Sequence, residues 1–209
     1  MSDHVSDTVI RLLLADDQAL VRGALSALLG LERDLEVVAE VSSGDEVLAA
    51  VREHRPDVAL LDVEMPGMDG IAATAVVRAE FPEVRVLIVT TFGRPGFLRR
   101  AMQAGASGFV VKDTPAAQLA DAVRRVHAGL RVVDPVLATE SLFAGESPLT
   151  ARETEVLRAA RGGAAVHVIA RALFLSEGTV RNHLSSAIGK TGAANRAEAV
   201  TIAEGNGWL

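Results

Sequence analysis

Cysteine is absent from the 209 residues, which excludes disulfide bonds and thiolate metal sites. The chain also lacks any apolar run approaching the roughly 18–20 residues that a membrane-spanning helix needs. Its first eight residues carry two aspartates and no lysine or arginine, which argues against a secretory signal. Together these absences predict a cytoplasmic protein that does not associate with membranes.

Lysine is nearly absent as well. Only Lys112 and Lys190 occur among the 21 basic side chains, and all the others are arginine. A compact ammonium cannot always be replaced by a planar guanidinium. Both lysines are therefore candidates for a specific role.

Charge is distributed unevenly along the chain. The first 146 residues hold 14 basic and 22 acidic side chains, a net charge of −8. Residues 147–209 hold seven basic and five acidic side chains, a net charge of +2. This asymmetry suggests that only the second part meets nucleic acid.

Short apolar runs alternate with helical patterns in the first part of the chain. Alternation of this kind predicts a parallel sheet with helices on both faces. The runs are apolar throughout, as strands buried on both faces are. We predict an α/β domain at residues 8–129 with a doubly wound five-stranded parallel sheet. Its strands are expected at residues 9–15, 35–41, 58–61, 86–89 and 108–111.

The alternation stops at Leu130. Residues 130–148 are predicted to be a linker with a short helix that begins at Asp134-Pro135. Residues 149–209 show only helical periodicity and should form a second, smaller all-α domain.

The second domain contains a helix-turn-helix spacing. One helix is expected at about residues 166–173, followed by a three-residue turn and a second helix from about residue 177 to 188. Upstream, Thr150 and Glu153 have the spacing of a capping box, which would start the first helix of this domain.

Charged and hydroxyl side chains follow the predicted strands. Asp16 and Asp17 follow the first strand, Asp62 the third and Lys112 the fifth, and Thr90 ends the fourth. The carboxyl ends of parallel strands share one edge of a sheet, where ligands bind. Three crowded carboxylates need a cation, and oxygen ligands suit Mg²⁺. A carboxylate beside Mg²⁺ can attack phosphorus and form an acyl phosphate.

Each of these residues taken alone has an ordinary explanation. Adjacent aspartates after a strand are usually a turn or a helix cap, Asp62 could begin a loop, and Lys112 could be a solvated surface lysine. Their joint occurrence at successive strand ends, in this order, favours a single site instead.

The segments around these residues resemble the CheY-like receiver domain of response regulators. The resemblance covers residues 10–128 and rests on residues 14–17, 60–70, 89–91 and 104–112. It implies that Asp62 accepts a phosphoryl group from a histidine kinase. It also implies that Lys112 and Thr90 contact the phosphoryl oxygens and that Phe109 is the switch aromatic.

The same resemblance implies a Mg²⁺ site. Asp17 would bind the ion directly, Asp16 largely through water, and Asp62 and the backbone carbonyl of Glu64 would complete the protein ligands. Glu64 also places a charge beside the phosphoryl group.

The second helix of the helix-turn-helix has a polar face. Val180, Leu184 and Ile188 recur every four residues and should pack inward, which leaves the polar side chains for the major groove. Those side chains are Thr179, Arg181, Asn182, Ser185 and Lys190. We expect Arg181, Asn182 and Ser185 to meet bases and Lys190 to meet a phosphate. A plain helical bundle for dimerisation is the alternative.

Residues 149–157, 175–184 and 195–199 resemble the LuxR-type DNA-binding domain, so the whole chain is similar to the NarL/FixJ family. The resemblance implies a transcription factor that dimerises when phosphorylated and binds two half-sites on DNA. Residues 90–97 and the Gly207-Trp208 ending are similar to the DesR-type branch. Three positions depart from the pattern: Val168, where glutamate is usual, Ser185, where a long polar side chain is common, and Gly189, which weakens the helix.

Two other functions compete with this interpretation, in which the protein is not an enzyme. A Mg²⁺-dependent phosphatase could use Asp62 as its covalent nucleophile, but the chain has no second aspartate two residues later. A receiver that never takes phosphate would not need Asp17, Asp62, Thr90 and Lys112 together.

Overall fold

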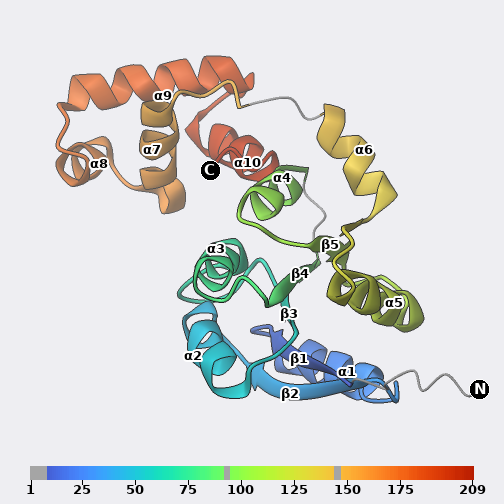
Figure 1. Cartoon of the computed structure of the whole chain (residues 1–209). Coiled ribbons are helices and arrows are strands. Elements are labelled where there is room, and N and C mark those ends of the chain that lie inside the picture. Colours follow the sequence, from blue (N-terminus) through green and yellow to red (C-terminus); the bar gives the residue numbers. More distant parts are fainter. Residues whose placement is uncertain (1–8, 92–94, 144–146) are drawn as a thin grey trace, which may run out of the picture. The chain divides into compact units, whose positions relative to one another are not determined.

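The computed structural model describes residues 9–91, 95–143 and 147–209 (Figure 1). These residues fall into two compact units, with the main division between Ala138 and Thr139. Residues 144–146 of the predicted linker lie outside the described residues.

The first unit is built on a six-stranded sheet in the order β2-β1-β3-β4-β5-β6, in which every neighbouring pair is parallel. The strands are β1 (Ile10–Ala15), β2 (Leu35–Val41), β3 (Val58–Leu61), β4 (Arg85–Thr90), β5 (Gly108–Val111) and β6 (Val132–Val133). The helices are α1 (Ala19–Leu29), α2 (Gly44–His54), α3 (Gly70–Glu80), α4 (Pro95–Gln103) and α5 (Ala116–His127). The division between the units falls within a further helix, α6 (Pro135–Phe143).

The sheet is buried between two layers of helices. Alternate residues of a strand point to opposite faces, so Leu13 joins one core while Leu12 and Leu14 join the other. Helices α2, α3 and α4 lie on the Leu13 face, and helices α1 and α5 lie on the opposite face (Figure 1). This confirms the doubly wound architecture and the five strands predicted from the sequence.

The sixth strand corrects the prediction that the alternation of strands and helices ends before residue 130. Val132 and Val133 pair in parallel with Gly108 and Phe109 of β5. A run of two apolar residues is too short to show a strand period, so no sequence pattern indicated this strand. The pairing covers the edge of β5, which would otherwise present unpaired backbone groups. Leu137 of α6 is 7 % exposed and packs into the first core, so this part of the linker is joined to the sheet.

The second unit is helical, as predicted. It contains α7 (Ala151–Ala159), a 3₁₀ turn (Arg161–Gly163), α8 (Val166–Ala172), α9 (Glu177–Thr191) and α10 (Arg196–Gly205). Its own core draws on all four α-helices, and Trp208 packs against that core. The Thr150–Glu153 capping box starts α7, and the Ser176 side chain accepts a hydrogen bond from the Thr179 amide to start α9.

The helices of both units are shorter or more polar than a membrane-spanning helix must be. Within the described ranges, no helix combines the length and the apolar character needed to cross a membrane. The predicted absence of a secretory signal concerns residues 1–8, which lie outside those ranges.

Candidate functional site

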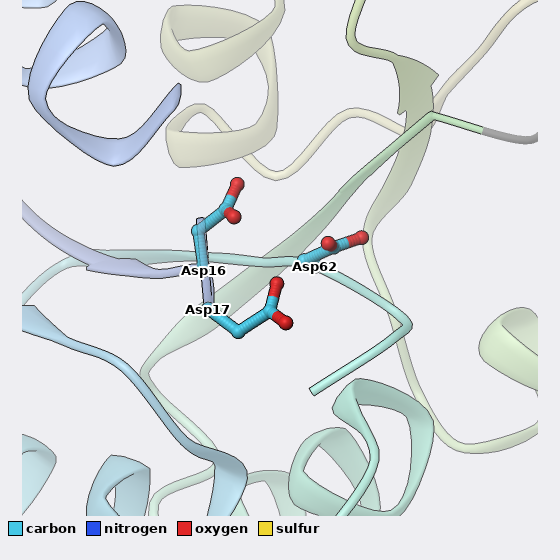
Figure 2. A group of neighbouring side chains, drawn as sticks. All are labelled: Asp16, Asp17 and Asp62. Atoms are coloured by element: carbon cyan, nitrogen blue, oxygen red, sulfur yellow. The ribbon is translucent and has the colours of Figure 1, made fainter. Parts of the chain in front are cut away.

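Three carboxylates meet at the carboxyl edge of the sheet. Asp16 and Asp17 leave the end of β1, and Asp62 leaves the end of β3 (Figure 2). One oxygen from each lies within 4.8 Å of the other two. Asp16 and Asp62 are buried, whereas Asp17 is exposed to solvent. The predicted convergence of these strand ends is therefore present in the structure.

Lys112 partly balances this negative charge. Its ammonium lies 2.7 Å from Asp16 Oδ2 and 2.8 Å from Asp62 Oδ2, and its side chain is 9 % exposed. Burial alone would lower the pKa of Lys112, but the hydrogen bonds to the two carboxylates outweigh burial and raise it. The lysine is therefore a fixed positive charge at the site.

Asp62 has one oxygen without a partner. Oδ2 accepts the hydrogen bond from Lys112, whereas Oδ1 is buried and has no hydrogen-bond partner among the described residues. Burial raises the pKa of Asp62, although Lys112 acts in the opposite direction. One ammonium cannot neutralise three carboxylates, and a buried oxygen without a partner is costly. The arrangement fits a divalent cation held by oxygen ligands.

The loop after Asp62 is fixed by close backbone packing. The Asp62 amide donates to the Ala15 carbonyl at 2.9 Å, and the Gly70 amide donates to the Val63 carbonyl at 3.0 Å. A Cβ on Gly70 would lie 1.9 Å from the Asp62 carbonyl oxygen, so only glycine fits there. Asp69 caps α3 by accepting from the Ala72 amide at 2.7 Å. These contacts hold the Asp62 backbone against the end of β1.

The remaining predicted residues of the first unit lie around this edge. Thr90 is buried at the end of β4, and its carbonyl accepts a hydrogen bond from the Lys112 amide at 2.8 Å. Glu64 is exposed in the loop that follows Asp62. Phe109 is completely buried in β5, and its carbonyl accepts from the Asp134 amide of the linker at 3.3 Å. Sequence reasoning missed this link between Phe109 and the linker.

The second helix of the helix-turn-helix, α9, has the predicted two-sided character. Val180, Leu184 and Ala187 are buried and Ile188 is half-buried. The exposed side chains include the three that were expected to face bases: Arg181, Asn182 and Ser185. Thr179 is tied to the helix start, where its hydroxyl lies 2.8 Å from Ser176 Oγ.

Two of the predicted DNA-contacting cations already have partners inside the unit. Arg181 Nη2 lies 2.6 Å from Glu177 Oε2, one helical turn earlier. Lys190 Nζ lies 2.7 Å from Glu153 Oε2 on α7. The first pair has the i,i+4 spacing that a sequence pattern can indicate. The second pair joins two helices that are distant in sequence.

Glu153 is a buried carboxylate that sequence reasoning assigned only to helix capping. It accepts hydrogen bonds from the Thr150 amide, the Ser186 hydroxyl at 2.6 Å and Lys190. Burial tends to raise the pKa of Glu153, but these donors outweigh it and lower the pKa to about 2. A signal was present: Glu153 falls on the same inward stripe of the helix as Val156, Leu157 and Ala160.

Comparison with protein families identifies both units. Residues 12–124 match the family described as response regulator receiver domain. Residues 147–203 match the family described as bacterial regulatory proteins, luxR family.

Full-length relatives show the same combination. The chain is 43 % identical over 201 residues to the transcriptional regulatory protein YvfU of Bacillus subtilis, covering 96 % of this chain and 100 % of that protein. It is 40 % identical to the transcriptional regulatory protein DesR of Bacillus subtilis, with the same coverage.

Solved structures agree in fold. The response regulator ChrA of a heme-sensing two-component system is 36 % identical, with a TM-score of 0.58 over 94 % of this chain and 97 % of that one. The response regulator RcsB in its DNA complex is 24 % identical, with a TM-score of 0.66 over 94 % of this chain and 98 % of that one. At that identity the second likeness shows the fold alone.

Proposed function

The chain belongs to the response regulators that join a receiver domain to a LuxR-type DNA-binding domain. On that premise we propose which residues carry out phosphoryl transfer, dimerisation and DNA binding. Proteins of this family are transcriptional regulators. Asp62 takes a phosphoryl group from a histidine kinase, and phosphorylation promotes dimerisation and sequence-specific DNA binding. The observation that carries the proposal is the buried Asp62 carboxylate, with one oxygen on Lys112 and the other free.

In the phosphoryl transfer, the free oxygen Asp62 Oδ1 is the nucleophile. A bond forms between this oxygen and phosphorus while the bond between phosphorus and the kinase imidazole nitrogen breaks, and the electron pair stays on the imidazole. Lys112 remains fixed at the other Asp62 oxygen and offsets the charge of the transferred group. Thr90 supplies a hydroxyl at the neighbouring strand end.

Asp16, Asp17, Asp62 and the carbonyl of Glu64 would hold Mg²⁺. The fit rests on the donor set: one oxygen from each of the three carboxylates lies within 4.8 Å of the other two, and Lys112 is the ammonium that contacts Asp16 and Asp62. Bound there, the ion would supply positive charge to the phosphoryl oxygens in the transition state.

The proposed domain limits are residues 8–129 for the receiver, 130–148 for the linker and 149–209 for the DNA-binding domain. The division of the described residues between Ala138 and Thr139 falls inside that linker. The first part of the linker, through Leu137, packs with the receiver core.

The dimer interface that we propose lies on α1. Leu20 of α1 is 87 % exposed, and Leu31, in the turn after the helix, is 79 % exposed. Among the described residues, nothing lies within 4 Å of the place where a Cβ on Gly23 would stand. With the exposed Ala24 and Ala27, the two leucines form an apolar stripe along α1 and the turn that follows it, which we call the α1 stripe. A smooth stripe of this kind suits close approach of a second copy of the same helix.

On the DNA-binding domain, α9 is the proposed recognition helix. Arg181, Asn182 and Ser185 are exposed and available to base edges. Thr179 stands at the start of the helix, where a phosphate or an outer base would approach. Lys190 is the proposed phosphate contact, and it would make that contact in competition with Glu153. The expected partners are double-stranded DNA with two half-sites, a second copy of the chain, and a sensor histidine kinase in the cytoplasm.

Labelling with a small phosphodonor in the presence of Mg²⁺ tests the proposal. One phosphoryl group should be incorporated per chain, and Asp62→Ala should incorporate none. DNA binding measured on the same samples should increase with labelling of the wild type only. If Asp62→Ala is labelled at the wild-type rate, the acceptor assignment is wrong. If the wild type instead turns over a phosphoester substrate, the phosphatase alternative holds.

A further inference from the structure

The recognition helix begins with a carboxylate that is paired with its principal base-reading candidate. Glu177 is the first residue of α9, and its Oε2 lies 2.6 Å from Nη2 of Arg181. The two side chains are 49 % and 62 % exposed, so both are accessible to a ligand on the same side of the helix. Glu177 is also the only acidic residue within α9.

The stability of the helix does not require this carboxylate. Ser176 already caps α9 by accepting a hydrogen bond from the Thr179 amide at 3.1 Å. Ion pairs between exposed side chains one helical turn apart stabilise a protein little. A negative charge at the DNA-facing end of a recognition helix also repels phosphates. A carboxylate in the first turn of a helix gains about 0.3–1 kcal/mol from the helix dipole wherever its side chain points. The pairing of Glu177 with Arg181 therefore points to a role in recognition.

We propose that Glu177 is a specificity-determining residue that acts by positioning Arg181. This inference rests on the proposed DNA-binding function of α9. A guanidinium has five donors, so Arg181 can keep one on Glu177 while two others bind guanine O6 and N7. The carboxylate thereby holds the guanidinium in an orientation suited to a base edge.

The same pair penalises non-specific binding. If Arg181 turned away to a phosphate, Glu177 would lose its partner in a region of high negative potential. On a cognate guanine the pair stays intact, because the guanine acceptors and the carboxylate use different donors of one guanidinium. Glu177 thus lowers affinity for arbitrary DNA more than it lowers affinity for the cognate site, which increases the ratio between them.

The experiment uses the full-length phosphorylated protein and a cognate duplex selected by the wild type from a randomised pool. Wild type, Glu177→Gln, Arg181→Ala and the double variant are titrated against cognate and scrambled duplexes at several salt concentrations. Glu155→Gln is the matched control, because it removes the carboxylate of an exposed intrahelical pair with Arg152 on α7. Thermal unfolding followed by Trp208 fluorescence verifies that each variant has a folded DNA-binding domain.

Glu177→Gln is expected to increase affinity for scrambled DNA about three- to tenfold and to steepen the salt dependence by about one unit per monomer. The ratio of cognate to scrambled affinity should fall about tenfold, with loss of the guanine preference at one position. In the Arg181→Ala background the Glu177→Gln change should cause no further loss of that preference. Glu155→Gln should behave as the wild type in every titration.

An unchanged affinity ratio in Glu177→Gln, with a wild type that discriminates, would overturn this inference and leave the proposed function standing. Glu177→Gln could instead remove a preference for cytosine at one position, both in the wild type and in the Arg181→Ala variant. That result would also overturn the inference, because Glu177 would then read a base directly. A phosphorylated wild type that selects no duplex from the pool would overturn the proposed function, and this inference with it.

Discussion

Lys190 on α9 donates a hydrogen bond to Glu153 on α7, with Nζ 2.7 Å from Oε2, and this carboxylate is only 4 % exposed. The Ser186 hydroxyl donates to the other oxygen of the same carboxylate. Two residues of α9 are therefore anchored to α7 through one side chain. Because this carboxylate also belongs to the capping box of α7, the orientation of α9 and the first turn of α7 depend on the same group.

Replacement of this carboxylate should weaken the DNA-binding domain in a pH-dependent way. The pKa of Glu153 is about 2 in the folded chain and 4.5 in its unperturbed state. A carboxyl group with a depressed folded-state pKa stabilises the protein above its unfolded pKa, and that contribution is lost as pH falls through the folded pKa. Glu153→Gln should therefore cost on the order of 2–3 kcal/mol at pH 7, and the difference from wild type should shrink between about pH 5 and pH 2.

Urea unfolding followed by Trp208 fluorescence measures this in the full chain, because Trp208 is the only tryptophan and packs against the core of the second unit. Glu155→Gln is the control, since Glu155 is half exposed and pairs with Arg152 on its own helix. A Glu153→Gln variant as stable as wild type at pH 7 would show that the buried pair contributes nothing net.

Lys190 has two proposed roles that salt dependence separates. As a phosphate contact, it should contribute about one unit per monomer to the slope of log affinity against log salt concentration. We expect Lys190→Ala to flatten the slope by that amount and to lower the affinity for cognate and scrambled duplexes equally. The domain should also lose stability, because Glu153 is left buried without its cation. An unchanged slope combined with lower stability would leave Lys190 a purely structural residue.

Magnesium binding should stabilise the receiver through the acidic cluster. A ligand at ten times its dissociation constant raises the free energy of unfolding by about 1.4 kcal/mol. The midpoint temperature of unfolding, measured by far-ultraviolet circular dichroism, should therefore rise by several degrees when Mg²⁺ is added to wild type. It should not rise when Mg²⁺ is added to Asp17→Asn. Asp69→Asn is the control, since Asp69 caps α3 and lies outside the cluster of three carboxylates. An equal shift in Asp17→Asn would remove Asp17 from the ligand set.

The sequence was informative wherever one local pattern determines the outcome. Continuous apolar runs identified the strands, and parallel strands bring Asp16, Asp17, Asp62 and Lys112 to one edge whatever the details of packing. The contact between Lys190 and Glu153 could not be predicted in this way. The capping box already explained Glu153, and the contact depends on how α7 crosses α9, which no local pattern specifies.

The first part of the linker should behave as part of the receiver. Val132 and Val133 extend the sheet beside β5, and Leu137 is 7 % exposed in the core that contains Phe109. Leu137→Ala should therefore destabilise the receiver by about 2–5 kcal/mol, as truncation of a buried leucine usually does. Val136→Ala, at a position that is 64 % exposed on the same helix, should change stability by less than about 0.5 kcal/mol. Equal effects of the two substitutions in a urea titration followed by circular dichroism would place Leu137 outside the core.

Dimerisation of the phosphorylated chain should depend on the α1 stripe. Ala24 lies in the middle of this stripe, between the exposed Leu20 and Leu31. An arginine there would place a charge in an apolar contact between two copies, and burial of an unpaired charge is costly. With a fluoride mimic of phosphoryl and Mg²⁺, light scattering should show the dimer mass for wild type and the monomer mass for Ala24→Arg. Because Ala24 is exposed, the variant should fold normally and Asp62 should still be phosphorylated. Val136→Arg, an exposed substitution outside α1, should dimerise as wild type does. A full dimer mass in Ala24→Arg would move the interface away from α1.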